Sequence, residues 1–189
     1  MELFGEIPAE VLEQDQSVIF GLDSSLQIVY CNAAWDAFAA ANGGCDLLRP
    51  APLGHPLLNY IGGSLAGYYE SAYRSVLQTS ELWRHVYECS SASVYRKYAM
   101  QVLPMKRMRG LLVVNSLCVE RPHEPARNGV RPLDYRFANG MVVMCSHCRR
   151  TKRSDGSEQW DWVPEHVATM PRNTSHGLCG VCFEYYYPK

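Results

Sequence analysis

VIFGLDSSLQIVYCNAAWDAF, residues 18–38, carries the clearest pattern of secondary structure in this chain. Two runs rich in β-branched and aromatic residues, VIFGL and LQIVY, flank a turn that begins at Asp23. Asn32 is then followed by AAWDAFAAA, in which Trp35 and Phe38 share one helical face, so Asn32 is predicted to cap a helix. The stretch therefore predicts a β-hairpin that leads directly into a helix.

The elements that follow complete a sheet. LAGYYESAYRSVLQT, residues 65–79, places its apolar side chains at helical spacing. Three β-rich runs come after it, at residues 82–90, 94–105 and 110–120, and the last is apolar throughout its middle, as in a central strand. This order predicts an α+β fold: a five-stranded antiparallel sheet with helices on one face.

The chain is predicted to divide into four parts. Residues 1–16 form a short N-terminal helical segment, and residues 17–120 form the sheet domain. Residues 121–140 are rich in Pro, Arg and Gly and read as a linker. Residues 141–189 form a small module with paired cysteines.

Composition narrows the class of protein. The 189 residues are 47% hydrophobic and 20% charged, which suits a globular chain with a core. A net charge of −1 gives no support for nucleic acid or an anionic membrane as an obligatory partner. The most apolar run is too short to cross a bilayer, and the acidic N-terminus lacks the basic start of a signal peptide. We therefore expect a cytoplasmic protein with reduced thiols and no membrane-bound part.

Four of the eight cysteines occur as two pairs of equal spacing: Cys145, Cys148, Cys179 and Cys182. Two cysteines three residues apart in a tight turn can present both sulfurs to one ion, and two such turns give a tetrahedral shell. Zinc suits this shell because it binds thiolate strongly and imposes no other geometry, so we expect a closed structural zinc site. Iron in a rubredoxin-like site and uncoordinated thiols are the alternatives.

Two histidines accompany these pairs. His176 is a candidate hydrogen-bond donor to a sulfur or an alternative ligand, whereas His147 is expected to be an exposed residue of its turn. A c-type haem is not expected, because Arg149 and Phe183 stand where a histidine must follow a CxxC pair.

The first two thirds of the chain, about residues 17–120, resemble the PAS family of sensory domains. The resemblance rests on residues 18–38, on LGHPLLNYIGG before the long helix, and on the closing strands that end in GLLVVNSLCVE. It implies a sheet and helices that enclose a small pocket. Such a pocket usually senses a ligand, a cofactor or a partner, and such a domain is not usually an enzyme.

The resemblance also bears on the ligand. Haem-binding PAS domains commonly use a histidine on the long helix, and flavin-binding ones a cysteine within Asn-Cys-Arg-Phe-Leu-Gln. Residues 65–79 contain no histidine and Cys45 stands in GGCDLLRP, so we expect neither cofactor. The candidate pocket residues are Phe20, Leu22, Trp35, Phe38, Tyr60, Tyr69, Tyr73, Tyr98, Met100 and Val114. A fully packed core without a cavity is the alternative.

Residues 141–188 are similar to a C-terminal cysteine module attached to bacterial receiver and PAS-type signalling proteins. That pattern runs from C-x-x-C through basic residues, an acidic turn with Gly and an aromatic residue to S-H-G-x-C-x-x-C and a final Tyr-Pro. Its positions are held here by Cys145, Cys148, Arg149, Asp155, Gly156, Trp160, Ser175, His176, Gly177, Cys179, Cys182, Tyr187 and Pro188. The resemblance implies a bacterial signalling protein.

Together these features predict a stand-alone bacterial sensor. A PAS domain would respond to a small ligand or a partner, and a structural zinc module would serve protein interaction. No enzymatic activity is expected, because the sequence has no phosphate-binding loop, kinase signature or nucleophile elbow. The expected partners are a signalling protein and a second copy of the chain, which would contact the N-terminal helix around Val11 and Leu12.

Two other functions stay open. The basic run Arg149, Arg150, Lys152 and Arg153 could contact phosphates beside a zinc knuckle, as in a zinc-dependent nucleic-acid-binding regulator. We favour a solvated loop instead, because acidic residues follow the run closely. The thiolates could also release zinc on oxidation, which would make the module a redox sensor.

Overall fold

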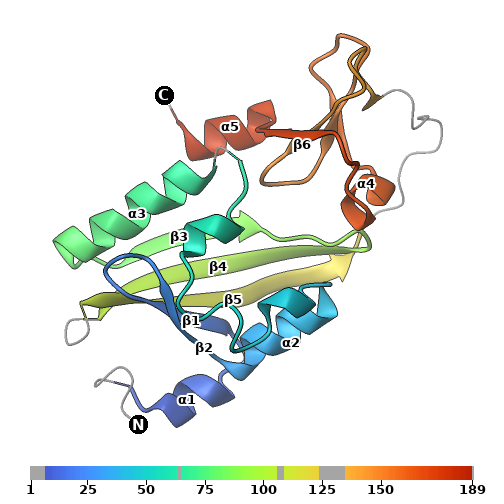
Figure 1. The fold of residues 1–189 in the computed structure, drawn as a ribbon. Coiled ribbons are helices and arrows are strands. Elements are labelled where there is room, and N and C mark those ends of the chain that lie inside the picture. Colours follow the sequence, from blue (N-terminus) through green and yellow to red (C-terminus); the bar gives the residue numbers. More distant parts are fainter. Residues whose placement is uncertain (1–6, 64, 106–108, 124–134, 189) are drawn as a thin grey trace. The chain divides into compact units, whose positions relative to one another are not determined.

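The computed structural model describes residues 7–63, 65–105, 109–123 and 135–188 (Figure 1). The chain divides into two compact units. The first consists of Met1–Ile61, Tyr69–Tyr87 and Tyr98–Cys118, and the second of Gly62–Tyr68, Glu88–Lys97 and Val119–Lys189, as far as their residues are described. Most of the predicted linker at residues 121–140 lies outside the described residues.

A five-stranded sheet has the strand order β2-β1-β5-β4-β3. Its strands are β1 (Val18–Leu22), β2 (Ile28–Cys31), β3 (Trp83–Glu88), β4 (Val94–Met105) and β5 (Gly110–Pro122). β1 pairs antiparallel with both of its neighbours. The predicted five-stranded antiparallel sheet is confirmed, and β5 lies at its centre, as its apolar sequence indicates.

The β1–β2 hairpin forms where the sequence places it. The Oδ1 atom of Asp23 accepts the backbone N–H groups of Ser25 at 2.8 Å and Gln27 at 2.9 Å. A short polar side chain that bonds to the backbone ahead of it stabilises such a turn. Phe20 is then paired with Cys31 across the hairpin.

Among the described residues three α-helices accompany the sheet: α1 (Ala9–Gln14), α2 (Ala33–Ala41) and α3 (Leu65–Thr79). Two short 3-10 helices, η1 (Cys45–Leu47) and η2 (Leu57–Tyr60), lie between α2 and α3 in the sequence. Asn32 caps α2, because its Oδ1 atom accepts the N–H group of Trp35 at 3.1 Å. The same oxygen accepts the N–H group of Ile19 at 3.0 Å, and the side-chain amide donates to the carbonyl of Leu12 at 3.0 Å. Asn32 therefore ties α1, β1 and α2 together.

α2 and α3 lie against one face of the sheet. Phe38 of α2 contacts the ring of Tyr98 edge-on, with 6.0 Å between ring centroids. Tyr73 of α3 is 1% exposed, and its hydroxyl lies 3.5 Å from the sulfur of Met100 in β4. The short helix α1 packs on the opposite face through Leu12.

The second unit contains a four-stranded sheet in the order β8-β7-β6-β9. Its strands are β6 (Val142–Cys145), β7 (Thr151–Lys152), β8 (Trp160–Asp161) and β9 (Thr174–Gly177), and its helices are α4 (Pro164–Ala168) and α5 (Gly180–Tyr186). A few buried side chains support it, among them Tyr135, Val142 and Met144. Such a small core supplies little stability alone. Among the helices that the structure describes, none combines the length and apolar character that crossing a bilayer requires.

Candidate metal centre

The two CxxC pairs meet because β6 and β9 run parallel. Cys145, the last residue of β6, is paired with Gly177, the last residue of β9. Both strands therefore deliver their following turns to the same edge of the sheet. The backbone N–H of Ser146 donates to the carbonyl of Gly177 at 2.7 Å, which fixes one turn against the other. Cys179 then stands directly before α5, and Cys182 lies within its first turn.

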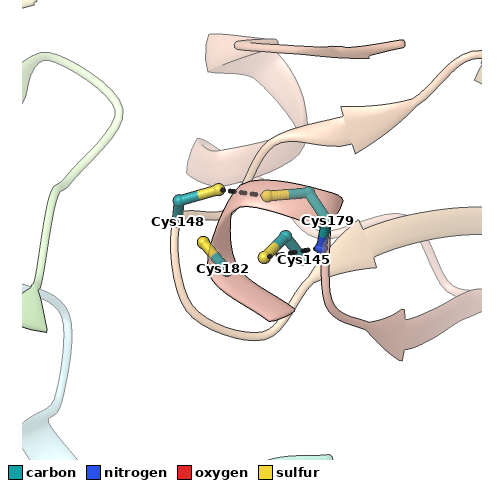
Figure 2. A group of neighbouring side chains, drawn as sticks. All are labelled: Cys145, Cys148, Cys179 and Cys182. Atoms are coloured by element: carbon teal, nitrogen blue, oxygen red, sulfur yellow. Dashed lines mark hydrogen bonds between the residues drawn. The ribbon is translucent and has the colours of Figure 1, made fainter. Parts of the chain in front are cut away.

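The four sulfur atoms of Cys145, Cys148, Cys179 and Cys182 all lie within 4.8 Å of one another, and the four residues are buried (Figure 2). The Sγ atoms of Cys148 and Cys179 are 3.8 Å apart. A tetrahedral ion with bonds of about 2.3 Å to sulfur separates its ligands by about 3.8 Å. The group can therefore hold a metal ion with small adjustments of the side chains.

The cysteines form no disulfide: all eight are free thiols. The pKa of Cys145 lies far below its usual range, because the thiols of Cys148, Cys179 and Cys182 hydrogen-bond to its thiolate. Cys145 raises the pKa of Cys179, but hydrogen bonds from Cys148 and Cys182 outweigh it and lower that pKa to about 7. The same contacts raise the pKa of Cys148 and of Cys182, because a thiol that donates to a neighbouring thiolate holds its proton. Without an ion the cluster therefore favours thiolates at Cys145 and Cys179 and thiols at Cys148 and Cys182, and metal binding has to displace the remaining protons.

The two histidines near the cysteine pairs lie in different environments. His147 was expected to be exposed, and that prediction is wrong: the ring is half-buried, and its Nδ1 atom lies 2.6 Å from the hydroxyl oxygen of Tyr186. Burial lowers the pKa of His147, which favours the neutral ring. His176 is exposed and lies outside the group of four sulfurs, and its predicted role as a ligand or hydrogen-bond donor stays a prediction.

Two residues of the basic run form ion pairs with acidic side chains. Lys152 forms an ion pair with Glu158 at 2.7 Å, and Arg153 forms one with Asp161 at 2.5 Å. Groups that are already paired are less available to phosphates, because each contact would have to replace an existing one. This finding favours the solvated loop over a nucleic-acid surface.

The ten predicted pocket residues all belong to the first unit, but they do not share one site. Phe20, Leu22, Tyr69, Tyr73, Tyr98 and Met100 are buried. Trp35 contacts Phe20 edge-on at 5.5 Å between centroids, and Phe38 contacts Tyr98. Tyr60 is 42% exposed and so lies at the surface. These contacts describe a packed aromatic layer.

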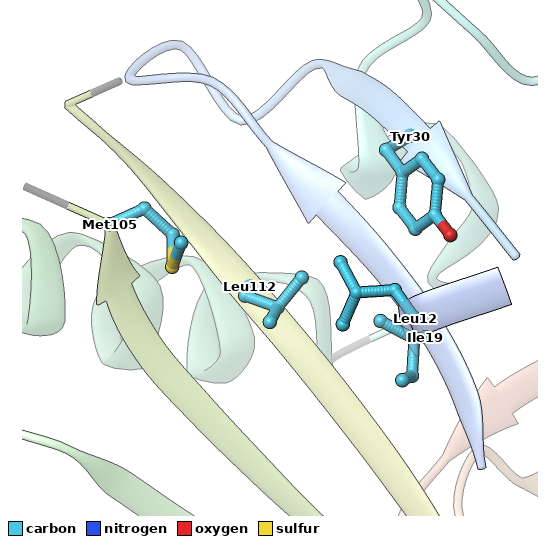
Figure 3. Packing of buried hydrophobic residues seen from close by; sticks show 5 residues of the cluster. All are labelled: Leu12, Ile19, Tyr30, Met105 and Leu112. Atoms are coloured by element: carbon cyan, nitrogen blue, oxygen red, sulfur yellow. The ribbon is translucent and has the colours of Figure 1, made fainter. Parts of the chain in front are cut away.

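Val114 lies on the other face of the sheet. It packs against the cluster of Leu12, Ile19, Tyr30, Met105 and Leu112 (Figure 3). In β1 and β5, Val114 is paired with Ile19, whereas Phe20 is paired with Val113. Since neighbouring residues of a strand point to opposite faces, Val114 points away from the side of Phe20.

An aromatic row on β3 was not among the predicted site residues. Trp83 and His85 stack at 5.2 Å between ring centroids, and His85 and Tyr87 stack at 6.4 Å. Tyr87 also donates its hydroxyl to the side-chain oxygen of Asn115 in β5, at 3.0 Å. The alternation of aromatic residues in WRHVYE could have indicated this row, because residues two apart share a face.

A surface depression of about 510 Å³ opens beside the end of α3. Its lining includes Arg74, Leu77, Pro104 and Arg109, and it includes none of the ten predicted pocket residues. A second depression of about 310 Å³ lies beside α1, with Glu13 and Tyr30 in its wall, and it also includes none of them. The predicted ligand pocket therefore stays a prediction.

Comparisons with known proteins add a likeness of fold. A scan of models of protein families and a search of curated proteins gave no match. Among solved structures, a domain of an HTR-like protein from Haloarcula marismortui is similar, with 17% identity and a TM-score of 0.42 over 56% of this chain and 100% of that one. The PAS domain of nitrogen regulation protein NR(II) from Vibrio parahaemolyticus is similar at 14% identity, with a TM-score of 0.35 over 60% and 99%. Likenesses this distant assign the chain to no family.

Proposed function

We propose that Cys145, Cys148, Cys179 and Cys182 bind one zinc ion that stabilises the second unit. The observation that carries this proposal is the buried group of four sulfurs within 4.8 Å of one another. A shell of four thiolates leaves no open position for water or substrate, so the role of the ion is structural. The core of the second unit is small, so metal binding would supply much of the folding free energy of this unit.

The first unit is, in this proposal, the sensory part of a bacterial signalling protein, which binds a small ligand or a partner protein. Its support is the PAS-like pattern of residues 17–120 together with the five-stranded antiparallel sheet. Homodimerisation belongs to the same proposal. Leu12 is 5% exposed within its own chain, which leaves Val11, at 56%, as the apolar residue of α1 that a second copy could contact.

Metal analysis combined with an absorption spectrum tests the zinc proposal. Protein purified without added metal is expected to contain one zinc per chain and to show no visible band. A visible band with iron in the same amount would replace zinc by a rubredoxin-like iron site, and protein without metal that keeps its fold would overturn the proposal.

A binding titration tests the competing nucleic-acid function. Mixed-sequence DNA at low salt is expected to leave the protein unshifted in a native gel, because the basic run is partly paired with acidic residues. A shift that weakens as salt is raised would instead support contact with phosphates.

A further inference from the structure

Two segments from the predicted sensor range belong to the same compact unit as the cysteine centre. They are Gly62–Tyr68, which includes the start of α3, and Glu88–Lys97, which joins β3 to β4. Each segment touches the turn that carries the first cysteine pair or helix α5, which contains Cys182. The centre is therefore built partly on residues far from it in the sequence.

The first contact is a close fit at Gly63. This glycine has a φ of +63°, and a Cβ atom added to it would lie 2.6 Å from the Oγ atom of Ser146 and 3.1 Å from the Cβ atom of His176. Ser146 follows the ligand Cys145 directly, and His176 is paired with Met144 in the adjoining strand. The turn that carries the first cysteine pair thus lies against Gly63 without room for a methyl group.

The second contact runs through His147, between the cysteines of the first pair. Its Nε2 atom accepts the backbone N–H of Glu88 at 3.4 Å. A neutral ring that accepts at Nε2 carries its proton on Nδ1, so Nδ1 donates to the hydroxyl of Tyr186, 2.6 Å away. His147 therefore joins the segment between β3 and β4 to α5.

The third contact joins α5 to the start of α3. The ring of Tyr68 meets the ring of Tyr186 edge-on, with 4.8 Å between centroids. Tyr186 stands four residues after the ligand Cys182 in α5, and residues at this spacing lie on one face of a helix. The position of Tyr186 therefore depends on the helix that Cys182 anchors.

We infer that the cysteine centre acts as a metal-dependent clamp on Gly62–Tyr68 and Glu88–Lys97. A bound ion fixes Ser146 and His147 through Cys145 and Cys148, and it fixes Tyr186 through Cys182. Removal of the ion leaves the three contacts without their support, so both segments open more often. The metal state of the centre is thereby passed to the beginning of α3 and to the β3–β4 connection. This inference rests on the proposed metal binding.

Hydrogen exchange of the full chain, with metal and after chelation, tests the clamp. Metal removal is expected to speed amide exchange at residues 62–68 and 88–97 by about tenfold or more, and at residues 69–87 and 98–118 by less than about twofold. Metal content is measured on the same samples. A chain that binds metal but exchanges equally in both states would overturn the clamp alone. A chain that binds no metal would overturn the proposed function and the clamp with it.

A pair of glycine variants separates the clamp from the metal ligands. Gly63→Ala is expected to keep its metal but to exchange at least about threefold faster at residues 62–68, because the methyl group collides with Ser146. Gly62→Ala controls for an added methyl group, since a Cβ atom there would meet nothing within 4 Å. Gly63→Ala combined with Ser146→Ala keeps the backbone strain of a positive φ but removes the colliding oxygen, so it is expected to exchange more slowly than Gly63→Ala alone. Equal exchange in metal-loaded Gly63→Ala and Gly62→Ala, or no slowing in the double variant, would contradict the clamp.

Discussion

The Sγ atoms of Cys148 and Cys179 lie 3.8 Å apart, although the residues are separated by 31 positions in the sequence. The parallel pairing of β6 with β9 produces this proximity, because it brings the ends of both strands to one edge of a sheet. The separation equals the edge of a tetrahedron with bonds of about 2.3 Å. The pairing of the two strands thus brings the sulfur atoms to the spacing that a tetrahedral ion requires.

Replacing one cysteine of the group should remove the metal. Changes to residues outside the ligand shell typically lower metal affinity by about 10- to 100-fold. Cys148→Ser is expected to lower it by more, because it removes a thiolate ligand. Metal content after gel filtration measures this. Cys45→Ser is the control, since Cys45 is exposed and lies outside the group. Equal metal content in both variants would exclude Cys148 as a ligand.

Loss of the Tyr186 hydroxyl should weaken the second unit. Tyr186→Phe removes the acceptor for the Nδ1 proton of His147 and is expected to lower the free energy of unfolding by about 0.5–1.5 kcal/mol. Chemical denaturation of the metal-loaded protein measures the change. The neighbouring Tyr185 is 52% exposed, so Tyr185→Phe should stay within about 0.5 kcal/mol of the parent chain. A smaller effect at Tyr186 than at Tyr185 would argue against the bond to His147.

Asn32 should be the most sensitive polar residue of the first unit. Asn32→Ala is expected to lower the free energy of unfolding by about 3 kcal/mol or more, because it removes the cap of α2 and leaves buried backbone groups of Ile19 and Leu12 without this partner. Asn42→Ala, at the exposed end of the same helix, should cost less than about 1 kcal/mol. Similar denaturation midpoints for the two variants would contradict the linking role of Asn32.

Alkaline pH should destabilise the first unit through Cys31. Burial raises the pKa of this thiol from an ordinary value of 9.0 to about 12. A raised folded pKa means that the stabilising contribution is complete below pH 9 and is lost as pH rises toward 12, by up to about 1.4 kcal/mol per pH unit.

Denaturation curves between about pH 8 and 11 measure this effect, and comparison with variants in the same buffer removes the contribution of other groups. Cys31→Ala should show a flatter loss of stability with pH than the parent chain. Cys118→Ala, at an exposed cysteine, should keep the parent slope. Parallel curves for Cys31→Ala and the parent chain would show that Cys31 does not titrate in this range.

Local patterns predicted the elements of the first unit well. Helices 33–41 and 65–79 have the bounds that their apolar spacing indicates, and Asn32 caps the first of them. The face of the sheet to which each side chain points was harder to predict. β5 is apolar on both sides, so alternation could not assign Val114 to a face, and Leu12 looked available for a dimer contact until the structure placed it in the core.

The cysteine group was predictable because two CxxC pairs of equal spacing are typical of a metal site with four thiolate ligands. Its surroundings were not, because they depend on contacts between distant parts of the chain. His147 bonds to Glu88, which lies 59 positions earlier, and Gly63 fits against Ser146. No short sequence pattern records such pairs, so the half-buried state of His147 emerged only from the fold.

Titration of the metal-free, reduced chain with cobalt(II) is the decisive experiment for a site of four cysteine ligands. Thiolate ligands give cobalt(II) sulfur-to-metal charge-transfer bands, and tetrahedral geometry gives it intense ligand-field bands in the visible region. A four-cysteine zinc site predicts that these bands saturate at one cobalt per chain, disappear when one equivalent of zinc is added, and are weaker and need more cobalt to form in Cys148→Ser. Bands that fail to form in the parent chain, or that persist unchanged in Cys148→Ser, would contradict a four-cysteine zinc site.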